Sequence, residues 1–331
     1  MDKEAASSPL SFFTYLKNKY GGKKRIVLLG NYGITNLGDI AILTVLLDTL
    51  GKTHPDSKIF IPSYQPSEIK SSFNMPSASF FSAATVFGLL NSDFIILSGG
   101  MFGKHASRKS PLLINVLSIL QKLGKKIIFY NVGIYRDCTR CDLNKLFRLM
   151  EGIDTIVLRE DSDLSAIPES IIKKSFVAPD VTYQIEIPKS KNSGKIGIIL
   201  RFWDWHNTEA ITAIIKRLFK ESKKQFVLYA FSLDEKNLLE KFFKENLDPE
   251  RITVFYDLDP KKTIKSMSTL AAAVTRPYHS IVFAHALGVP QIVMPYDRKC
   301  ENLVRIHDLE SVDLNEKTYH KLKSFIEKNS G

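Results

Sequence analysis

The chain has 331 residues, 44% of them hydrophobic, enough to build two domains with cores of ordinary size. Its net charge of +11 favours anionic partners, but no basic block with interleaved aromatics and no zinc-finger or RNA-binding motif predicts a nucleic-acid surface. No apolar stretch reaches the length of a membrane span, and the apolar cluster near the N-terminus is too short for a secretory signal, so we expect a cytoplasmic protein.

Residues 11–24 set aromatic side chains beside four lysines. This composition suits contact with an anionic membrane, at the inner face of that membrane. An ordinary lead-in helix before the first strand explains the same pattern, and we favour that interpretation.

The first half alternates buried strands with helical patterns. A strand at 25–30 precedes a loop in which Gly33 and Gly38 permit tight turns, and Asp39 stands where a helix N-cap is favoured. The strand at 93–100 ends in a glycine pair that lets a ligand approach the backbone. The remaining predicted elements are helices at 40–50, 112–123 and 142–150 and strands at 58–61, 126–132 and 155–159.

A polar linker at 186–194 precedes a second alternation. Strands are predicted at 195–201, 225–231, 252–255, 270–274 and 291–294. Helices are predicted at 210–219, 235–244, 260–267 and from about 316 to 328, and a further helix should begin where Arg276 and His279 stand and run to about 287. Alternating strands and helices predict parallel sheets covered by helices. The chain is therefore expected to form two Rossmann-like α/β domains, residues 1–187 and 195–331, facing a cleft.

Basic side chains follow three strands of the second half. Arg201 ends the first of its strands, Arg276 and His279 follow 270–274, and Lys299 comes after 291–294. The carboxyl ends of parallel strands share the edge where α/β sheets bind ligands, and the helix starting near His279 favours anions. Arg276 could instead pair with a structural carboxylate, and His279 could simply cap its helix. Together the four residues predict a phosphate or carboxylate site.

Other motifs carry less information. Cys138 and Cys141 form C-x-x-C, but no second Cys/His pair completes a site, and an odd total of three cysteines argues against a disulfide framework. Asp257-Leu-Asp259 resembles the D-x-D of metal-dependent sugar transfer, but we interpret it as a turn. Because neither the C-x-x-C nor the D-x-D motif predicts a metal site, we expect no metal. Trp203 and Trp205 could stack on a sugar ring or pack at a domain interface.

The chain resembles the polysaccharide pyruvyl transferase family. Five stretches carry the resemblance: NLGDIAIL at 36–43, ILSGG at 96–100, LREDS at 158–162, APD at 178–180, and 275–290 with the following YDRK at 296–299. The family is similar in fold to GT-B glycosyltransferases. The resemblance implies transfer of a carboxyethylidene group from phosphoenolpyruvate to a sugar, giving a pyruvate ketal and phosphate, with no metal or redox cofactor.

The resemblance also implies roles for individual residues. His279 would be the general acid or base, Arg201 and Arg276 would clamp phosphoenolpyruvate, and Asp39 would act on the acceptor hydroxyl. The implied donor-binding set is Arg201, Arg276, His279, Ser280 and Lys299. The implied acceptor-binding set is Asn36, Gly38, Asp39, Gly99 and Gly100. The acceptor would be a galactose or N-acetylated hexosamine of a capsule or exopolysaccharide, or its lipid-linked precursor.

Two alternatives stay open. A GT-B nucleotide-sugar glycosyltransferase shares the fold and the basic donor site, with Glu301 as a candidate for the ribose. An inactive carbohydrate-binding relative is favoured if the departures from the family pattern near Arg276 are disabling. Three positions depart from that pattern. Ile40 stands where the family commonly has Glu, Arg276 lies three residues before His279 instead of two, and Met101 replaces a frequent Gly.

Overall fold

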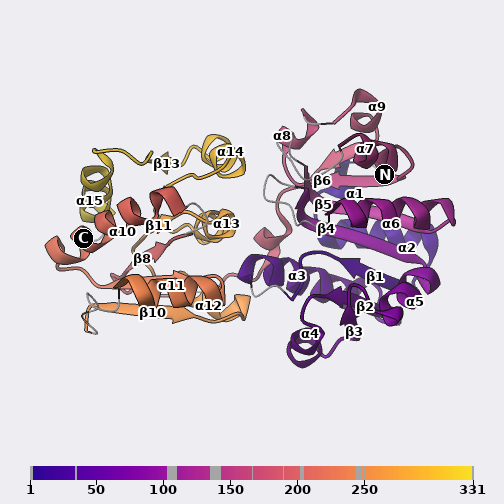
Figure 1. Cartoon of the computed structure of the whole chain (residues 1–331), viewed down its shortest axis with the longest axis horizontal. Helices are drawn as coiled ribbons and strands as arrows, with labels where there is room; N and C mark the ends of the chain where they lie inside the picture. The colour runs from indigo at the N-terminus through magenta and orange to yellow at the C-terminus, as the bar shows by residue number, and fades with distance from the viewer. Residues whose placement is uncertain are drawn as a thin grey trace. The chain divides into compact units, whose positions relative to one another are not determined.

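A computed structural model describes residues 3–33, 36–102, 110–134, 143–165, 167–188, 190–201, 205–243, 248 and 250–329. The chain forms two compact units (Figure 1), one of residues 1–34 and 39–184, the other of residues 35–38 and 185–331. The second unit thus takes a short segment from the first half, which the sequence did not predict. The sequence motifs at Cys138, Cys141 and Trp203, and the side chain of Trp205, lie outside the description.

The described part of the first unit holds a parallel sheet with strand order β3-β2-β1-β4-β5-β6-β7. Its strands are β1 (Arg25–Leu29), β2 (Lys58–Ser63), β3 (Ser77–Ser79), β4 (Phe94–Phe102), β5 (Lys126–Ile134), β6 (Thr155–Leu158) and β7 (Ser175–Val177). Its helices are α1 (Lys3–Ala6), α2 (Pro9–Tyr20), α3 (Leu37–Thr53), α4 (Pro66–Phe73), α5 (Ala83–Asn91), α6 (Ser110–Lys122), α7 (Leu143–Glu151), α8 (Asp161–Leu164), α9 (Glu169–Ile172) and the 3-10 helix η1 (Val181–Gln184).

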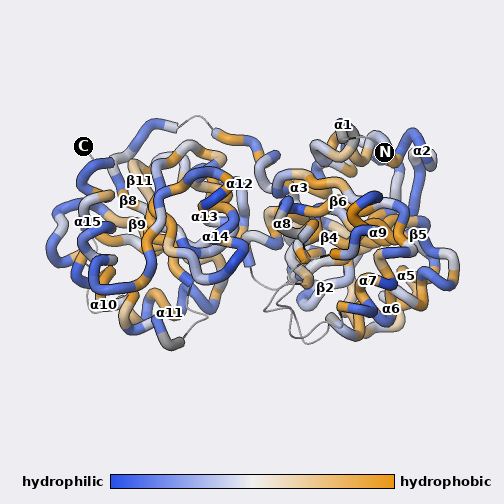
Figure 2. Tube along the Cα trace, turned by 90° about the horizontal axis from the view of Figure 1, so that it is seen from above, coloured by the Kyte–Doolittle hydropathy of each residue, from blue (hydrophilic) through white to orange (hydrophobic). Residues whose placement is uncertain are grey.

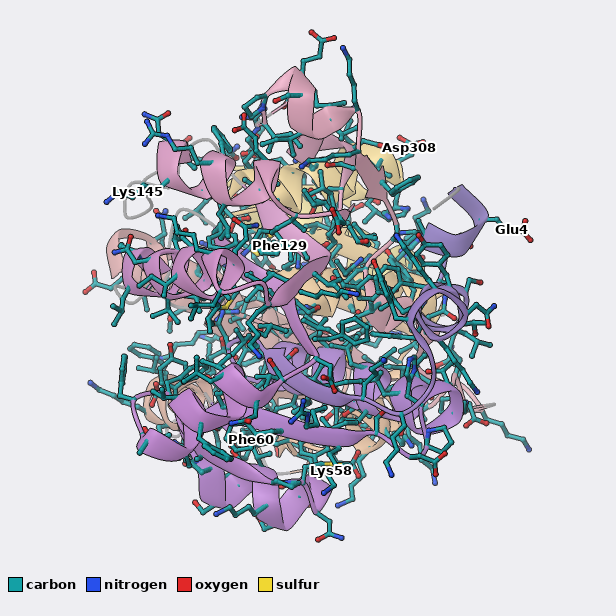
Figure 3. All side chains as sticks on the ribbon, turned by 90° about the vertical axis from the view of Figure 1, so that its right-hand side faces the viewer. Glu4, Lys58, Phe60, Phe129, Lys145 and Asp308 are labelled. Carbon is teal, nitrogen blue, oxygen red and sulfur yellow. The ribbon has the colours of Figure 1, made fainter. Side chains whose placement is uncertain are left out.

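Successive side chains of a strand point to opposite faces, and both faces of this sheet are covered. On one face α5, α6 and α7 bury Leu89, Leu117 and Leu146 in a core that includes Phe129 of β5, labelled in Figure 3. On the other face Phe12 of α2 stacks on Tyr130, the next residue of β5, with ring centroids 4.1 Å apart. The lead-in helix that we favoured is thus confirmed, and its aromatic residues Phe12 and Phe13 are buried rather than available to a membrane.

Helix α3 begins earlier than the sequence suggested, at Leu37 rather than Ile40. The Asn36 Oδ1 atom accepts a hydrogen bond from the Gly38 N–H at 3.0 Å, so Asn36 caps the helix. The expectation that Asp39 is the cap was wrong, because Asp39 already lies within the first turn. There its negative charge interacts favourably with the positive end of the helix dipole.

The second unit holds a parallel sheet with strand order β10-β9-β8-β11-β12-β13 among its described residues. Its strands are β8 (Ile196–Ile199), β9 (Phe226–Ala230), β10 (Ile252–Tyr256), β11 (Ala272–Thr275), β12 (Gln291–Val293) and β13 (Glu310–Ser311). Its helices are α10 (Trp205–Glu221), α11 (Leu233–Phe243), α12 (Pro260–Met267), α13 (Tyr278–Ala286), α14 (Arg298–Ile306) and α15 (Thr318–Asn329).

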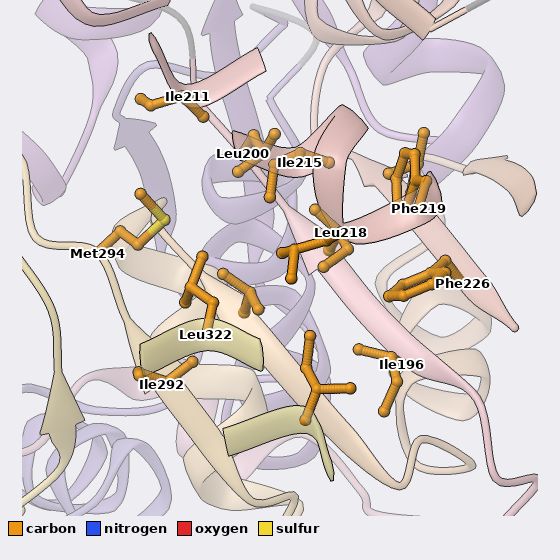
Figure 4. Close-up of a cluster of buried hydrophobic side chains, with 14 of the residues drawn as sticks. Ile196, Leu200, Ile211, Ile215, Leu218, Phe219, Phe226, Ile292, Met294 and Leu322 are labelled. Carbon is orange, nitrogen blue, oxygen red and sulfur yellow. The ribbon is translucent and has the colours of Figure 1, made fainter. Parts of the chain in front are cut away.

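The core of the second unit lies where α10 and α15 pack on the sheet (Figure 4). Ile211, Ile215 and Leu218 recur at helical spacing along α10 and meet strand residues such as Ile196 of β8. Leu322 of α15 closes the same core. Because the paired strands of this sheet all run parallel, their carboxyl ends lie at one edge. Among the described residues, no helix combines the length and apolarity needed to cross a membrane.

The Asn131 side chain joins the end of β5 to residues 178–181 at the carboxyl edge of the first sheet. Asn131 sits in a bulge of β5 with φ of 56°. Its side-chain amide donates to the carbonyls of Ala178 and Pro179, and its Oδ1 atom accepts from the Val181 N–H. Replacing Asn131 with alanine leaves these buried groups unsatisfied, so the free energy of unfolding should fall by about 3 kcal/mol in urea denaturation.

Asn91→Ala is the matched control, because the Asn91 amide donates only to a carbonyl of its own helix at the surface. That variant should stay within about 0.5 kcal/mol of the wild type. An equally small loss for Asn131→Ala would contradict the structural role assigned to this side chain.

Candidate functional site

Two buried arginines lie side by side at the carboxyl edge of the second sheet. Arg201 follows β8 and Arg276 follows β11, and these two strands pair in parallel. Arg201 is 9% exposed and Arg276 is 4% exposed. The Arg276 Nε atom donates a hydrogen bond to the backbone oxygen of Arg201 at 3.1 Å. The proximity predicted from strand ends is therefore present.

A buried carboxylate supports one of these arginines. The Glu235 Oε1 atom lies 3.7 Å from the Arg201 Nε atom, an ionic contact longer than a hydrogen bond. The Glu235 Oε2 atom accepts from the Phe231 N–H at 2.8 Å, which fixes the carboxyl group. Burial raises the pKa of Glu235, and the charge on Arg201 opposes that shift. Sequence reasoning missed Glu235 because an acid in the first turn of a helix looks like ordinary helix-start chemistry.

Lys299 stands beside the arginines at the next strand. It lies in the first turn of α14, and its Nζ atom is 3.3 Å from the Asp297 carboxylate, which also caps that helix. Burial by itself lowers the pKa of Lys299, but Tyr296 and Asp297 outweigh it, and the pKa is raised. The ammonium group therefore stays charged at neutral pH.

Tyr296 connects these cations. Its ring lies 5.4 Å from the Arg276 guanidinium carbon and 5.7 Å from the Lys299 Nζ atom, within the range of cation–π attraction. Burial raises the pKa of Tyr296, so the phenol stays protonated. Its hydroxyl is buried and has no hydrogen-bond partner among the described residues. Tyr296 lies in the YDRK stretch at 296–299, and its position just after β12 is the sequence feature that indicates a place at this edge.

His279 lies in the first turn of α13, directly against Gly38. A Cβ atom on Gly38 would stand 1.9 Å from the His279 Nδ1 atom, so any larger residue there requires the His279 ring to move. The Leu37 N–H donates to the Phe231 carbonyl at 2.8 Å, and Asn36 forms a bridge with Ser232. These contacts lie within the second unit, which thus brings Gly38 and His279 together. Gly38 was predicted to bind the acceptor and His279 the donor.

Two residues near the arginines, Ser280 and Cys300, form hydrogen bonds to backbone carbonyls. The Ser280 hydroxyl is buried and donates to the Pro277 carbonyl at 2.7 Å, so its proton is already used within the first turn of α13. The Cys300 thiol is buried and donates to the Arg276 carbonyl at 3.6 Å, and burial raises its pKa well above the usual value. Both groups therefore hold the backbone that carries Arg276 and His279.

In the first unit, Asp39 and the glycine pair meet at the carboxyl edge of the sheet. The Asp39 Oδ1 atom lies 3.9 Å from the position of a Cβ on Gly99, whose φ of +90° also favours glycine. The Arg159 Nη2 atom lies 4.0 Å from the corresponding position on Gly100. Asp39 therefore lies beside Gly99, and Arg159 lies next to Gly100; a shared role in acceptor binding stays a prediction.

Below the glycine pair lies a buried charged cluster. The Arg159 Nη1 atom is 3.5 Å from Asp180, and its Nε atom is 3.8 Å from Glu160. Asp180 also accepts hydrogen bonds from the N–H and hydroxyl of Thr182. The LREDS and APD stretches thus form one polar cluster that supports the strand ends.

The D-x-D tripeptide is a turn, as predicted. The Asp257 Oδ1 atom accepts from the Asp259 N–H, and Asp259 caps α12 by accepting from the Lys261 N–H. Within the described ranges, no group of three or more His, Cys, Asp or Glu residues is arranged to hold a metal ion.

The contact between Gly38 and His279 makes a paired prediction about glycines in α3. Gly51→Ala, with nothing within 4 Å of the added Cβ, should raise the free energy of unfolding by about 0.5–1 kcal/mol through better helix propensity. Gly38→Ala should instead lower it by about 1–3 kcal/mol, because the His279 ring must move. Thermal unfolding measures both; equal stabilisation by the two substitutions would show that His279 does not occupy this position.

Comparisons with known proteins agree on family and fold. The sequence model of the family described as polysaccharide pyruvyl transferase matches residues 36–298. A search of curated proteins finds no match. Among solved structures, UDP-GlcNAc 2-epimerase from Methanocaldococcus jannaschii is similar with a TM-score of 0.60 and 13% identity, over 92% of each chain.

Two further structures share the architecture. Staphylococcus aureus MnaA with UDP has a TM-score of 0.63 and 10% identity, over 93% of this chain and 90% of its own. An alpha-glucosyltransferase in complex with UDP-glucose and DNA has a TM-score of 0.57 and 12% identity, over 94% and 91%. With two parallel sheets, these likenesses confirm the predicted GT-B-type α/β fold. The match over most of the sequence places the chain in the polysaccharide pyruvyl transferase family.

Proposed function

We propose that this protein transfers a carboxyethylidene group from phosphoenolpyruvate to two hydroxyls of a sugar and releases phosphate. One observation carries the proposal: Arg201 and Arg276 are buried side by side at a strand edge, with Lys299 at the adjoining strand. Phosphoenolpyruvate carries a carboxylate and a phosphate, which need cations in a site that excludes water. Family membership supports the same reaction class.

The reaction divides into steps that match these side chains. A proton is added to the methylene carbon of phosphoenolpyruvate, which leaves an oxocarbenium-like centre on the neighbouring carbon. A sugar hydroxyl attacks that carbon, the carbon–oxygen bond to phosphate breaks, and a second hydroxyl closes the ketal. Of the two hydroxyl protons, one replaces the proton that was added and the other leaves with phosphate. The sequence of steps needs no metal or redox cofactor.

In this proposal Arg201 and Arg276 bind the donor anions, and His279 moves the proton. Histidine titrates near neutral pH, which suits both halves of that task. The Tyr296 hydroxyl, buried among the cations, is a further donor for a substrate oxygen. Lys299, whose raised pKa keeps it charged, would assist the phosphate.

The acceptor is proposed to be a sugar of a cell-surface polysaccharide or its lipid-linked precursor. Asp39 beside Gly99 places a carboxylate at the carboxyl edge of the first sheet, which suits a sugar hydroxyl. Gly100, which is only partly buried, would let the sugar approach, whereas the His279 ring fills the space at Gly38. Because Asn36 caps α3 with its amide oxygen, only its amide nitrogen would remain for the acceptor.

A second candidate is a nucleotide-sugar enzyme. Several proteins of similar fold were solved with UDP, UDP-glucose or UDP-GlcNAc. The same arginines could bind a diphosphate. The two candidates differ in the donor that stabilises the folded protein.

The first test is therefore thermal stability with each donor. Phosphoenolpyruvate at a hundred times its Kd should add about 2.7 kcal/mol of stability, because it binds only the folded state. Arg201→Ala and Arg276→Ala should abolish the increase in Tm, whereas Arg305→Ala, at an exposed position of α14, should keep it. An increase with UDP-GlcNAc or UDP-glucose alone would reject the pyruvyl reaction in favour of the nucleotide-sugar enzyme.

The second test separates proton transfer from binding. His279→Gln should keep the stabilisation by phosphoenolpyruvate but lower kcat by about 10²–10⁴-fold, the usual value of a general acid or base. Phosphate release in the presence of galactosides and N-acetylhexosaminides measures the rate. The exposed His320 supplies the control, since His320→Gln should change neither quantity. Unchanged kcat in His279→Gln would remove His279 from the mechanism.

A further inference from the structure

Large apolar side chains are exposed on two neighbouring helices of the first unit. Val86, Phe87 and Leu90 lie on α5, Ile119 lies on α6, and Leu123 follows α6. Their exposed fractions run from 44% to 69%. We name this set the apolar ridge. Single exposed apolar residues are common, but several on adjoining helices mark an interaction surface.

The two helices are held together where they end. Both α5 and α6 pack their inner sides into the same core, on the same face of the sheet (Figure 2). The Lys125 Nζ atom, just after α6, donates to the carbonyl of Ser92, just after α5, at 3.3 Å. Leu90 and Leu123 therefore stand at adjoining helix ends. Helices antiparallel to the strands end at the amino edge of the sheet, so this end of the ridge lies at that edge.

The amino edge of the sheet is strongly basic. Arg25 at the start of β1 pairs in register with Lys58 at the start of β2, which is labelled in Figure 3. Lys126 begins β5, which is separated from β1 by β4. The Lys126 Nζ atom lies 3.8 Å from the centroid of the Tyr20 ring, which brings the end of α2 to the same edge. We name the following residues the basic rim: Lys17, Lys19, Lys23, Lys24, Arg25, Lys58, Lys122, Lys125 and Lys126.

Carboxylates offset only part of this charge. Asp93 pairs with Arg25 at 3.1 Å, Asp56 precedes β2, and Asp154 precedes β6, where it interacts with the charge of Lys174. The positive charge of the rim also acts on a buried side chain. Burial lowers the pKa of His54, and the charges of Lys17 and Lys24 lower it further. The rim therefore keeps a net positive charge beside the apolar ridge.

We propose that the apolar ridge and the basic rim together dock this protein on an anionic lipid bilayer. The ridge side chains would enter the boundary between headgroups and acyl chains, and the lysines would lie against lipid phosphates. A second copy of the chain fits less well, because a symmetric contact would bring two basic rims together. The surface differs from the lead-in stretch 11–24 considered above, since Phe12 and Phe13 are buried and only its lysines take part.

Vesicle sedimentation tests the proposal without reference to any donor or acceptor. The wild-type protein should sediment with phosphatidylcholine vesicles that contain phosphatidylglycerol, and far less with pure phosphatidylcholine. Lys122→Glu should lower the partition coefficient roughly thirtyfold, since each charge near such a surface contributes about 1 kcal/mol. Phe87→Ser should lower it about tenfold through lost apolar insertion. Both positions are exposed, so the variants should fold.

Matched controls lie in the second unit. Lys321→Glu makes the same charge change on α15, and Ile306→Ser removes an exposed apolar side chain from the end of α14; both should bind as the wild type does. Equal losses in the controls and in Lys122→Glu and Phe87→Ser, or no sedimentation with anionic vesicles, would overturn the proposal. So would a concentration-dependent dimer that Phe87→Ser dissolves while vesicle binding is unchanged. Stabilisation by phosphoenolpyruvate should persist in Phe87→Ser, which separates this surface from the donor site.

Discussion

The burial of two like charges at neighbouring strand ends is the constraint on which the second unit depends. Arg201 and Arg276 both lose water there, and their charges repel each other in a medium of low dielectric constant. The protein compensates locally. Glu235 opposes Arg201, the Arg201 carbonyl accepts from Arg276, and the Tyr296 ring adds its electron-rich face. An arrangement of this kind is suited to a ligand that brings negative charge of its own.

Much of the fold could be predicted from the sequence because parallel strands buried on both faces read as continuous apolar runs. Helix α12 was predicted over residues 260–267, where the structure has it, since Pro260 fixes its start and Asp259 caps it. Helix α5 was missed because its sequence is apolar almost all round, which leaves no helical periodicity. Helix α14 was missed for the opposite reason, since most of its residues are polar.

The candidate site divides in the same way. Strand ends placed Arg201, Arg276 and Lys299 at one edge, because topology alone decides that neighbourhood. The predicted start of α3 was wrong, because the true start depends on a tertiary contact, the hydrogen bond from the Leu37 N–H to the Phe231 carbonyl. No local pattern announces such a contact. Glu235 was missed for a related reason: its partner is distant in sequence. The family and the GT-B fold are confirmed, whereas the roles of individual residues stay predictions.

The short motif Asn36-Leu37-Gly38-Asp39 is divided between two neighbourhoods. Its first three residues contact Phe231, Ser232 and His279, and its fourth faces Gly99. Selection should therefore act on the two parts separately, and residues 36–38 should covary with their distant partners Phe231, Ser232 and His279. A chimera that joins halves of two relatives at residue 185 alone would mismatch those partners. An interchangeable module must carry residues 35–38 together with 185–331, so the practical unit of exchange in this chain is discontinuous.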